Sequence, residues 1–113
     1  MSEEEVRPTI ITVDDKRFEL KYNFKTVEQI ENVTEKPLMS DLKDNEGLMS
    51  LSSLRTYVTL ALYGAEGTRV GHGTASKVFE EWIQSEGYGN VARVVLLQLQ
   101  KDVPFFFETD STD

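Results

Sequence analysis

Few side chains in this 113-residue sequence could do chemistry, because it contains one histidine, His72, and no cysteine. Without cysteine, thiolate zinc sites, iron–sulfur clusters, disulfides and thiol nucleophiles are excluded. With one histidine, a site of several imidazoles is excluded too, and a histidine-based triad has a single possible base. His72 stands between Gly71 and Gly73, where the sequence offers no rigid mount and no orienting group. We therefore interpret it as a solvated loop histidine.

The four glycines of residues 64–73 are a second candidate, because a glycine-rich loop can cradle a phosphate. The segment lacks the Gly-Lys-Ser/Thr ending of a P-loop and the spacing of the dinucleotide-binding fingerprint. No parallel βαβ pattern surrounds it either. We interpret the segment as a flexible connector between two helices.

Two acidic groups could bind a cation or form a carboxylate pair. Residues 41–47 resemble a calcium loop, but Lys43 falls at a ligand position and Glu46 falls where the glycine is required. Glu80 and Glu81 are adjacent on an expected helix, so their side chains point about a hundred degrees apart. We interpret the first group as a polar loop and the second as a solvated face. We therefore expect no catalytic residue, no metal site, no cofactor and no enzymatic activity.

The elements that would position these side chains begin with an expected β-hairpin over residues 9–22. Its first half, Thr9 to Val13, is β-branched throughout, and Asp14-Asp15-Lys16 has turn chemistry. In its second half apolar and charged residues alternate with a period of two, which gives one face for a core. The residues of that face are Phe18, Leu20 and Tyr22. A hairpin alone is marginal in water, so this face must rest on other elements.

The first two helices expected after the hairpin have recognisable start signals. A capping box at Thr26 starts the first helix, which ends before Pro37. Ser50 caps the second helix, which the apolar pattern extends through Leu62. Residues 38–49 between them fit either one or two helical turns or a loop.

The third and fourth helices differ in how their apolar residues are distributed. The third, which Thr74 opens, has the most regular amphipathic pattern of the chain. Asn90 caps the fourth, which runs to about Lys101 and ends before Pro104. Its run Val94 to Leu97 is apolar in every direction, so this helix either is central in the core or contacts a partner. The same run fits a buried strand, but the asparagine cap and the proline favour a helix.

Together these elements predict an α+β, mainly α fold, in which an N-terminal β-hairpin packs on a bundle of about four short helices. We expect a single domain over residues 9–107, with a flexible acidic N-terminus at 1–8 and a flexible acidic C-terminal tail at 108–113. The expected core includes Phe18, Leu20, Tyr22, Ile30, Leu54, Val58, Phe79 and Trp82.

The run Phe105-Phe106-Phe107 is unusual, because three successive phenylalanines cannot all point into one small core. Either the C-terminal segment folds back on the domain as a plug, or part of this apolar surface binds a partner. The sequence leaves both open. The candidate partner-binding residues are Val94, Val95, Leu96, Leu97, Phe105, Phe106 and Phe107.

The net charge and the absence of a targeting or membrane-spanning segment in the sequence disfavour nucleic-acid and membrane partners. Twenty acidic against twelve basic side chains give a net charge of −8, which disfavours nucleic-acid binding. Residues 1–5 are polar and acidic, unlike a signal peptide, and no apolar run is long enough to span a bilayer. We therefore expect a cytoplasmic protein with neither a nucleic-acid nor a membrane partner.

Four segments carry a resemblance to a known family. Ile11 to Phe24 follows the pattern isoleucine-X-valine, turn, aromatic-X-leucine-lysine-aromatic, and Lys25 to Leu38 continues as an acidic and aliphatic helix. Leu51 to Leu62 is a leucine-rich helix, and Val103 to Phe107 closes the pattern. This succession resembles the tail assembly chaperones of long-tailed, siphovirus-type bacteriophages and prophages, although Glu35 replaces the family's usual glycine.

The resemblance implies a non-enzymatic protein in the cytoplasm of a bacterial host. Chaperones of this family bind the long, hydrophobic tape measure protein and keep it soluble while tail tube subunits polymerise around it. The implied partners are thus the tape measure protein and, as a further one, the tail tube protein; a homo-oligomer is compatible with this role. The competing hypothesis is a structural virion protein, such as a head–tail connector or tail completion protein, which builds a ring and stays in the particle.

Overall fold

The computed structural model describes residues 9–38 and 49–106, which form a three-stranded antiparallel sheet and four α-helices. The strands are β1 (Thr9–Val13), β2 (Lys16–Leu20) and β3 (Leu62–Gly64), in the order β1-β2-β3. The helices are α1 (Phe24–Thr34), α3 (Leu51–Thr59), α4 (His72–Glu86) and α5 (Tyr88–Asp102), followed by a 3-10 turn, η1 (Pro104–Phe106). The predicted α+β, mainly α fold with an N-terminal hairpin is confirmed.

The hairpin is closed by a tight turn of two aspartates. Asp14 and Asp15 have φ angles of 52° and 65°, and the flanking Val13 and Lys16 pair with each other. Left-handed conformations at both turn positions match the right-handed twist of the strands, as in a type I′ turn. Along the strands Ile11 pairs with Phe18, and both side chains are buried against the helices.

The third strand is where the structure departs most from the sequence prediction, which extended the second helix through Leu62. α3 ends at Thr59, and Leu62 instead pairs with Leu20 of β2. Ending the helix at Thr59 lets the chain pair with the backbone groups of β2 and of Lys21 that follows it, which a longer helix would leave unpaired. The Lys21 N–H, for example, donates to the Ala61 carbonyl at 3.0 Å. Leu62 is fully buried in the strand and also fits the apolar pattern of a longer helix, so its apolar character could not distinguish the two conformations.

The glycine-containing segment after β3 is an ordered return rather than the predicted flexible connector. The Gly64 N–H donates to the Thr68 carbonyl at 2.8 Å, and the Val70 N–H donates to the Leu62 carbonyl at 3.0 Å. Gly67, with a φ of 85°, provides the left-handed residue that this turn needs. These bonds lay the segment along the outer edge of β3.

The helix starts differ from the predicted ones by a few residues, except at Ser50. The Ser50 hydroxyl accepts from the Ser53 N–H at 3.1 Å, as predicted. α1 begins at Phe24 because the Asn23 side chain, and not Thr26, is the cap: Asn23 Oδ1 accepts from the Thr26 N–H at 2.8 Å. α5 follows α4 after Gly87 alone, whose φ of 91° allows the chain to reverse.

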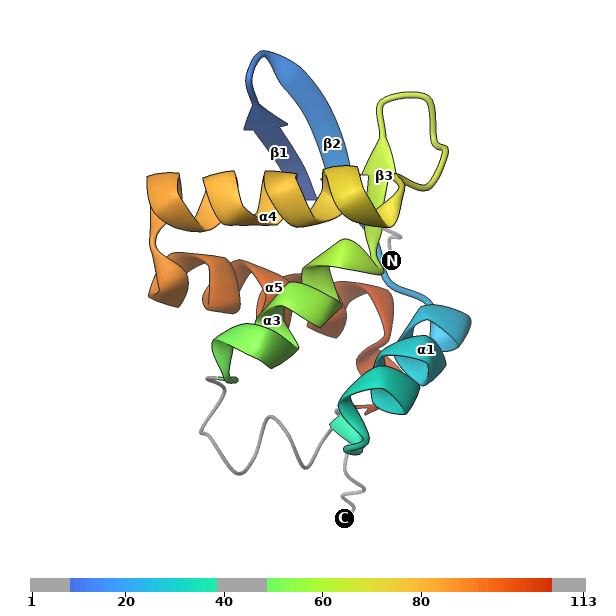
Figure 1. The fold of residues 1–113 in the computed structure, drawn as a ribbon. Helices are drawn as coiled ribbons and strands as arrows, with labels where there is room; N and C mark the ends of the chain where they lie inside the picture. Colours follow the sequence, from blue (N-terminus) through green and yellow to red (C-terminus); the bar gives the residue numbers. More distant parts are fainter. Residues whose placement is uncertain (1–8, 39–48, 107–113) are drawn as a thin grey trace.

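The core lies between the sheet and the helices. In Figure 1, α4 crosses in front of the hairpin. α5 runs antiparallel to α4, on the side of α4 away from the hairpin, and α3 lies in front of α5. All eight side chains predicted for the core are buried, and Trp82 keeps 8% of its surface exposed. The switch from a period of two to a period of 3.6 after Phe24 therefore predicted which faces meet.

Candidate functional site

The predicted apolar surface on α5 is largely part of the core. Val95 has no exposed surface, and Val94 and Leu96 are partly buried against the core cluster. Leu97 is the one exposed residue of this run, with 46% of its surface accessible. The prediction that Val95 contacts a partner is therefore wrong, because Val95 is a core residue. The run is apolar on several sides because α3 and α4 both pack against this helix.

The predicted C-terminal surface is represented by Phe105, which is 54% exposed. Its ring lies near that of Phe24, which is 57% exposed, with 6.1 Å between the ring centroids and 39° between the planes. The side chain of Phe106 and all of Phe107 lie outside the described residues. The exposed aromatic surface that the structure shows thus joins η1 to the first residue of α1.

Phe24 was not among the site residues predicted from the sequence, because it fell between the hairpin expected over residues 9–22 and the helix expected from Thr26. The signal that could have found it is Asn23, a strong N-cap residue that places Phe24 at the first helical position. A side chain at that position can lie outside the buried stripe of the helix. The buried side of α1 is instead formed by Thr26, Val27 and Ile30.

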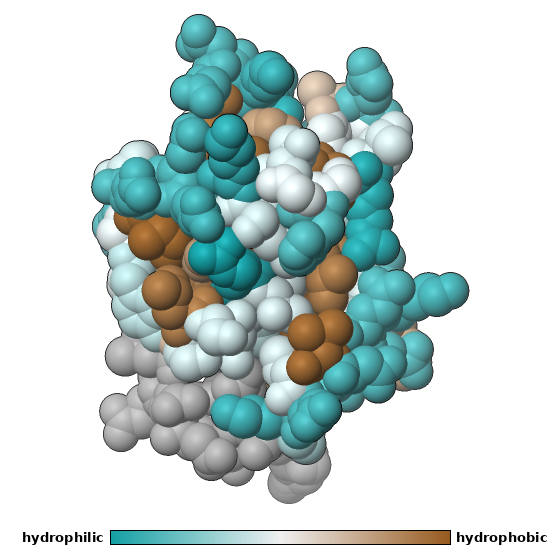
Figure 2. Space-filling model, in the orientation of Figure 1, coloured by the Kyte–Doolittle hydropathy of each residue, from teal (hydrophilic) through white to brown (hydrophobic). Residues whose placement is uncertain are grey.

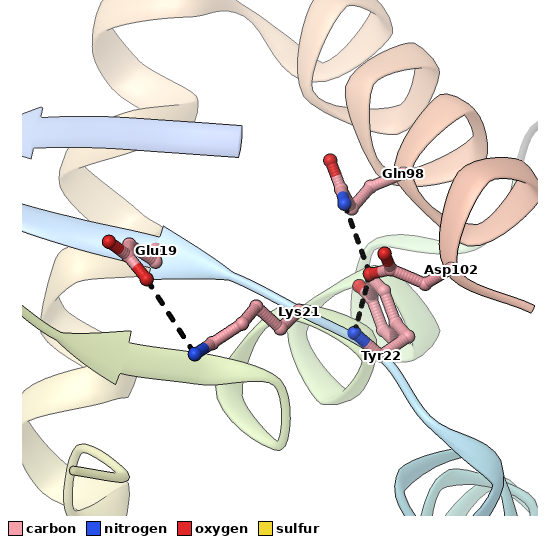
Figure 3. Close-up of polar contacts among 5 residues, drawn as sticks. All are labelled: Glu19, Lys21, Tyr22, Gln98 and Asp102. Atoms are coloured by element: carbon pink, nitrogen blue, oxygen red, sulfur yellow. Dashed lines mark hydrogen bonds and ion pairs between the residues drawn. The ribbon is translucent and has the colours of Figure 1, made fainter. Parts of the chain in front are cut away.

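A hydrogen-bonded cluster holds the two phenylalanine-bearing segments together (Figure 3). Asp102 Oδ2 accepts from the Tyr22 N–H at 2.8 Å and from Gln98 Nε2 at 3.0 Å. Gln98 Oε1 in turn accepts from the Thr9 hydroxyl at 2.6 Å, and Gln98 is 1% exposed. The end of α5 is therefore fixed to the chain that leads from β2 into α1. Phe24 follows that chain directly, so the cluster determines where the ring pair forms.

Tyr22 extends this cluster into the core. Its hydroxyl donates to the Tyr57 carbonyl in the last turn of α3 at 2.8 Å. Burial raises the pKa of the Tyr22 hydroxyl well above its ordinary value, and the nearby Tyr57 and Asp102 add to the rise. The phenol is thus held neutral and acts as a hydrogen-bond donor to the end of a helix.

A small cavity lies between the hairpin turn and α4. Its volume is about 230 Å³, below the roughly 300–1,000 Å³ typical of small-molecule sites. Apolar side chains and charges of both signs line it: Val13, Phe18 and Val78, with Asp14, Lys16, Thr74, Lys77 and Glu81. The cavity is therefore smaller than a typical small-molecule site.

The other residues singled out in the sequence are separated in the structure. His72 is exposed, but it is the first residue of α4 and not part of a loop. Glu80 pairs with Arg55 of α3 at 3.1 Å, whereas the adjacent Glu81 lines the cavity, so the two carboxylates diverge as predicted. Residues 41–47, which resemble a calcium loop, lie outside the described residues. Within the described ranges, no group of three or more acidic or histidine side chains is placed to hold a metal ion.

Large apolar side chains are exposed at six described positions: Ile10, Phe24, Val33, Leu51, Leu97 and Phe105. Figure 2 shows that, on the face seen in Figure 1, hydrophobic residues form separate patches divided by hydrophilic ones. Among the six residues, Phe24 and Phe105 are the pair with a ring–ring contact. This pair is the best-defined apolar contact site that the structure presents.

Comparison with protein-family models, with curated protein sequences and with solved structures gives no match. In residues 9–38 and 49–106, no helix combines the length and the apolar character needed to cross a membrane.

Proposed function

We propose that this protein is a tail assembly chaperone of a long-tailed phage or prophage and binds the tape measure protein through exposed apolar side chains. The observation that carries the proposal is the ring pair of Phe24 and Phe105, each more than half exposed. Aromatic side chains contribute disproportionately to protein–protein binding energy when a partner covers them. The nature of the partner comes from the resemblance of the chain to this family.

The rigidity of the ring pair supports a binding role. Tyr22 lies two residues before Phe24, and Asp102 lies three residues before Phe105. The hydrogen bond that joins Tyr22 to Asp102 therefore restrains both phenylalanine-bearing segments. A partner that covers a preorganised apolar pair loses less conformational entropy than one that must order a flexible segment. An apolar helix of a long, hydrophobic protein is a suitable occupant for such a pair. The net charge of −8 would keep the resulting complex soluble.

The test is co-expression with the tape measure protein, which in this family is encoded by a very long gene just downstream. The wild-type chain should increase the soluble amount of tape measure protein and co-purify with it. The double variant Phe24→Ser with Phe105→Ser should lose both effects and keep a nearly unchanged melting temperature, because exposed side chains contribute little to folding. Val33→Ser is the matched control, since Val33 is 61% exposed on the same helix but belongs to no ring pair.

Two results would contradict the proposal in different ways. A double variant that still captures the tape measure protein would exclude the ring pair as the binding site. A wild-type chain that fails to capture it, but is present in purified particles, would favour the competing hypothesis of a connector or tail completion protein.

A further inference from the structure

The two outer edges of the sheet are treated differently by the chain. The outer edge of β3 is covered, because the Leu62 carbonyl and the Gly64 N–H are bonded to Val70 and Thr68 of the return segment. Among residues 9–38 and 49–106, none covers the outer edge of β1 in this way. Within the described residues, no backbone hydrogen bond outside the hairpin ladder involves Ile10 or Thr12.

The register of the hairpin identifies the backbone groups at this uncovered edge. Val13 and Lys16 close a two-residue turn, so this pair exchanges hydrogen bonds and every second pair along the ladder does the same. The Lys21 N–H bonds to Ala61 on the other side, which is the alternation expected for β2. The N–H and C=O groups of Ile10 and Thr12 therefore point away from β2.

The sequence of β1 lacks the features that usually protect an edge strand. Thr9–Val13 contains no charged residue, no proline and no glycine, and it pairs with β2 without a bulge. Ile10 is 44% exposed beside this edge. Pro8 precedes the strand and the Asp14-Asp15 turn follows it, so pairing at this edge is confined to the strand itself.

We propose that the β1 edge is a homodimer interface, at which β1 of one copy pairs antiparallel with β1 of a second copy. A two-fold axis at Ile11 places Ile10 opposite the partner's Thr12 and Thr12 opposite the partner's Ile10. This register uses all four outward-pointing groups of each chain. The two three-stranded sheets then join into one continuous sheet across the dimer.

A second copy fits this edge better than an unrelated strand because the edge is self-complementary. Two bonding residues spaced symmetrically about Ile11 are what an isologous interface requires, since the same surface serves both partners. Shifting the axis to Ile10 or Thr12 would bring the opposing strand's proline or aspartate turn into the ladder. The inference concerns this edge alone and does not depend on the function of the Phe24–Phe105 pair.

The dimer should be weak and favoured by salt. A single pair of five-residue strands buries less than the roughly 1,000 Å² of a stable interface. Each copy also carries a net charge of −8, so the two copies repel each other at long range. Sedimentation of the full chain should show a dimer that grows with concentration and becomes more abundant as ionic strength rises.

Thr12→Pro tests the backbone bond directly, because it removes an N–H that faces the edge and none that faces β2. It should weaken dimerisation about tenfold or more, since two symmetry-related hydrogen bonds are lost. Thr12→Val is the matched control, because it keeps the N–H and the β-branched shape and should still dimerise. If the proline variant loses its native circular dichroism, Ile10→Lys with Thr12→Lys provides a second test, since edge lysines block strand pairing.

The register can be tested by disulfide formation, because the chain contains no cysteine of its own. A mixture of Ile10→Cys protein and Thr12→Cys protein should form an intermolecular disulfide faster than either variant alone. Directly opposed residues bring their Cα atoms within disulfide range, whereas identical positions are offset by two residues. Ser85→Cys, at an exposed site on α4, gives the background rate.

Three results would overturn the homodimer at the β1 edge. A chain that stays monomeric at high concentration and high salt would overturn it. Dimers that persist in both the proline and the lysine variants, or a mixture that cross-links no faster than its components, would place the contact elsewhere and overturn it as well.

Discussion

α4 and α5 are neighbouring helices of 15 residues each, yet they are held in the fold by different means. The buried face of α4 is an apolar stripe at the spacing i, i+3, i+4, i+7, formed by Ala75, Val78, Phe79 and Trp82. The buried residues of α5 are Val91, Ala92, Val95, Gln98 and Leu99. In its last turns, Gln98 and Asp102 add hydrogen bonds to Thr9 and Tyr22 to the apolar contacts of Leu99.

This difference indicates where the fold is most sensitive to each kind of change. α4 depends on side-chain volume, so shortening a buried side chain there creates a cavity. The second half of α5 depends on paired polar groups as well as on the buried Val95 and Leu99, so removing one polar partner leaves another with an unsatisfied hydrogen bond. Four substitutions, taken from the largest expected effect to the smallest, test whether the two helices differ in this way.

Trp82→Ala tests the dependence of α4 on volume. Trp82 is the only tryptophan and is the last residue of the buried stripe, where it keeps 8% of its surface exposed. Its truncation should lower the free energy of unfolding by about 3–5 kcal/mol, as large-to-small aromatic changes in cores do. Urea denaturation measures the loss, and a value below about 1 kcal/mol would show that α4 is not held by packing.

Asp102→Ala tests the dependence of α5 on hydrogen bonds. The substitution removes the acceptor of the Tyr22 N–H and of Gln98 Nε2, so we expect a loss of about 2 kcal/mol in urea denaturation. Asp102→Asn, which keeps a carbonyl acceptor, should lose less. Gln100→Ala, on the exposed side of the same helix, is the control and should stay within about 0.5 kcal/mol of wild type. Equal losses for the alanine and asparagine variants would show that the bonds contribute little.

The contrast between the helices also explains how much could be predicted from the sequence. The stripe of α4 was predictable because apolar residues at helical spacing have few other interpretations. The roles of Gln98 and Asp102 were not predictable, because their partners lie 89 and 80 residues away and polar side chains usually face water. β3 was missed for a related reason: its pairing with β2 is a long-range contact that leaves no local pattern in Leu62 or Tyr63.

The candidate site was predictable only in part. The run of phenylalanines indicated an exposed aromatic surface, and Phe105 is indeed exposed. Val95 was placed on the surface wrongly, because a helix that is apolar on several sides gives no indication of which side meets the core. Phe24 was missed because its proximity to Phe105 depends on the same distant contact between Tyr22 and Asp102.

Tyr22→Phe examines how the α5 cluster extends to α3. It removes the bond that the Tyr57 carbonyl receives from the Tyr22 hydroxyl, so we expect a loss of about 1 kcal/mol at neutral pH. The pH dependence gives a second measurement. Because burial raises the pKa of Tyr22 in the folded state, the neutral phenol stabilises the fold fully below the unfolded value of about 10. That stability is lost as pH rises through the higher, folded pKa.

The alkaline loss should therefore be smaller in Tyr22→Phe than in wild type, because phenylalanine has no proton to release. Thermal melts of both proteins between neutral pH and about pH 11 measure the difference. Parallel curves over this range would show that the Tyr22 hydroxyl ionises as freely in the folded as in the unfolded chain.

Leu97→Ser has the smallest expected effect on stability and completes the comparison within α5. Leu97 is 46% exposed, whereas Leu99, two residues later, has no exposed surface. Leu97→Ser should change the free energy of unfolding by less than about 0.5 kcal/mol. Leu99→Ser should cost about 3 kcal/mol or more, because it opens a cavity and buries a hydroxyl. Urea denaturation of the two variants separates the core side of α5 from its outer side. A loss at Leu97 close to that at Leu99 would mean that both leucines are core residues, leaving Phe24 and Phe105 as the apolar surface available to a partner.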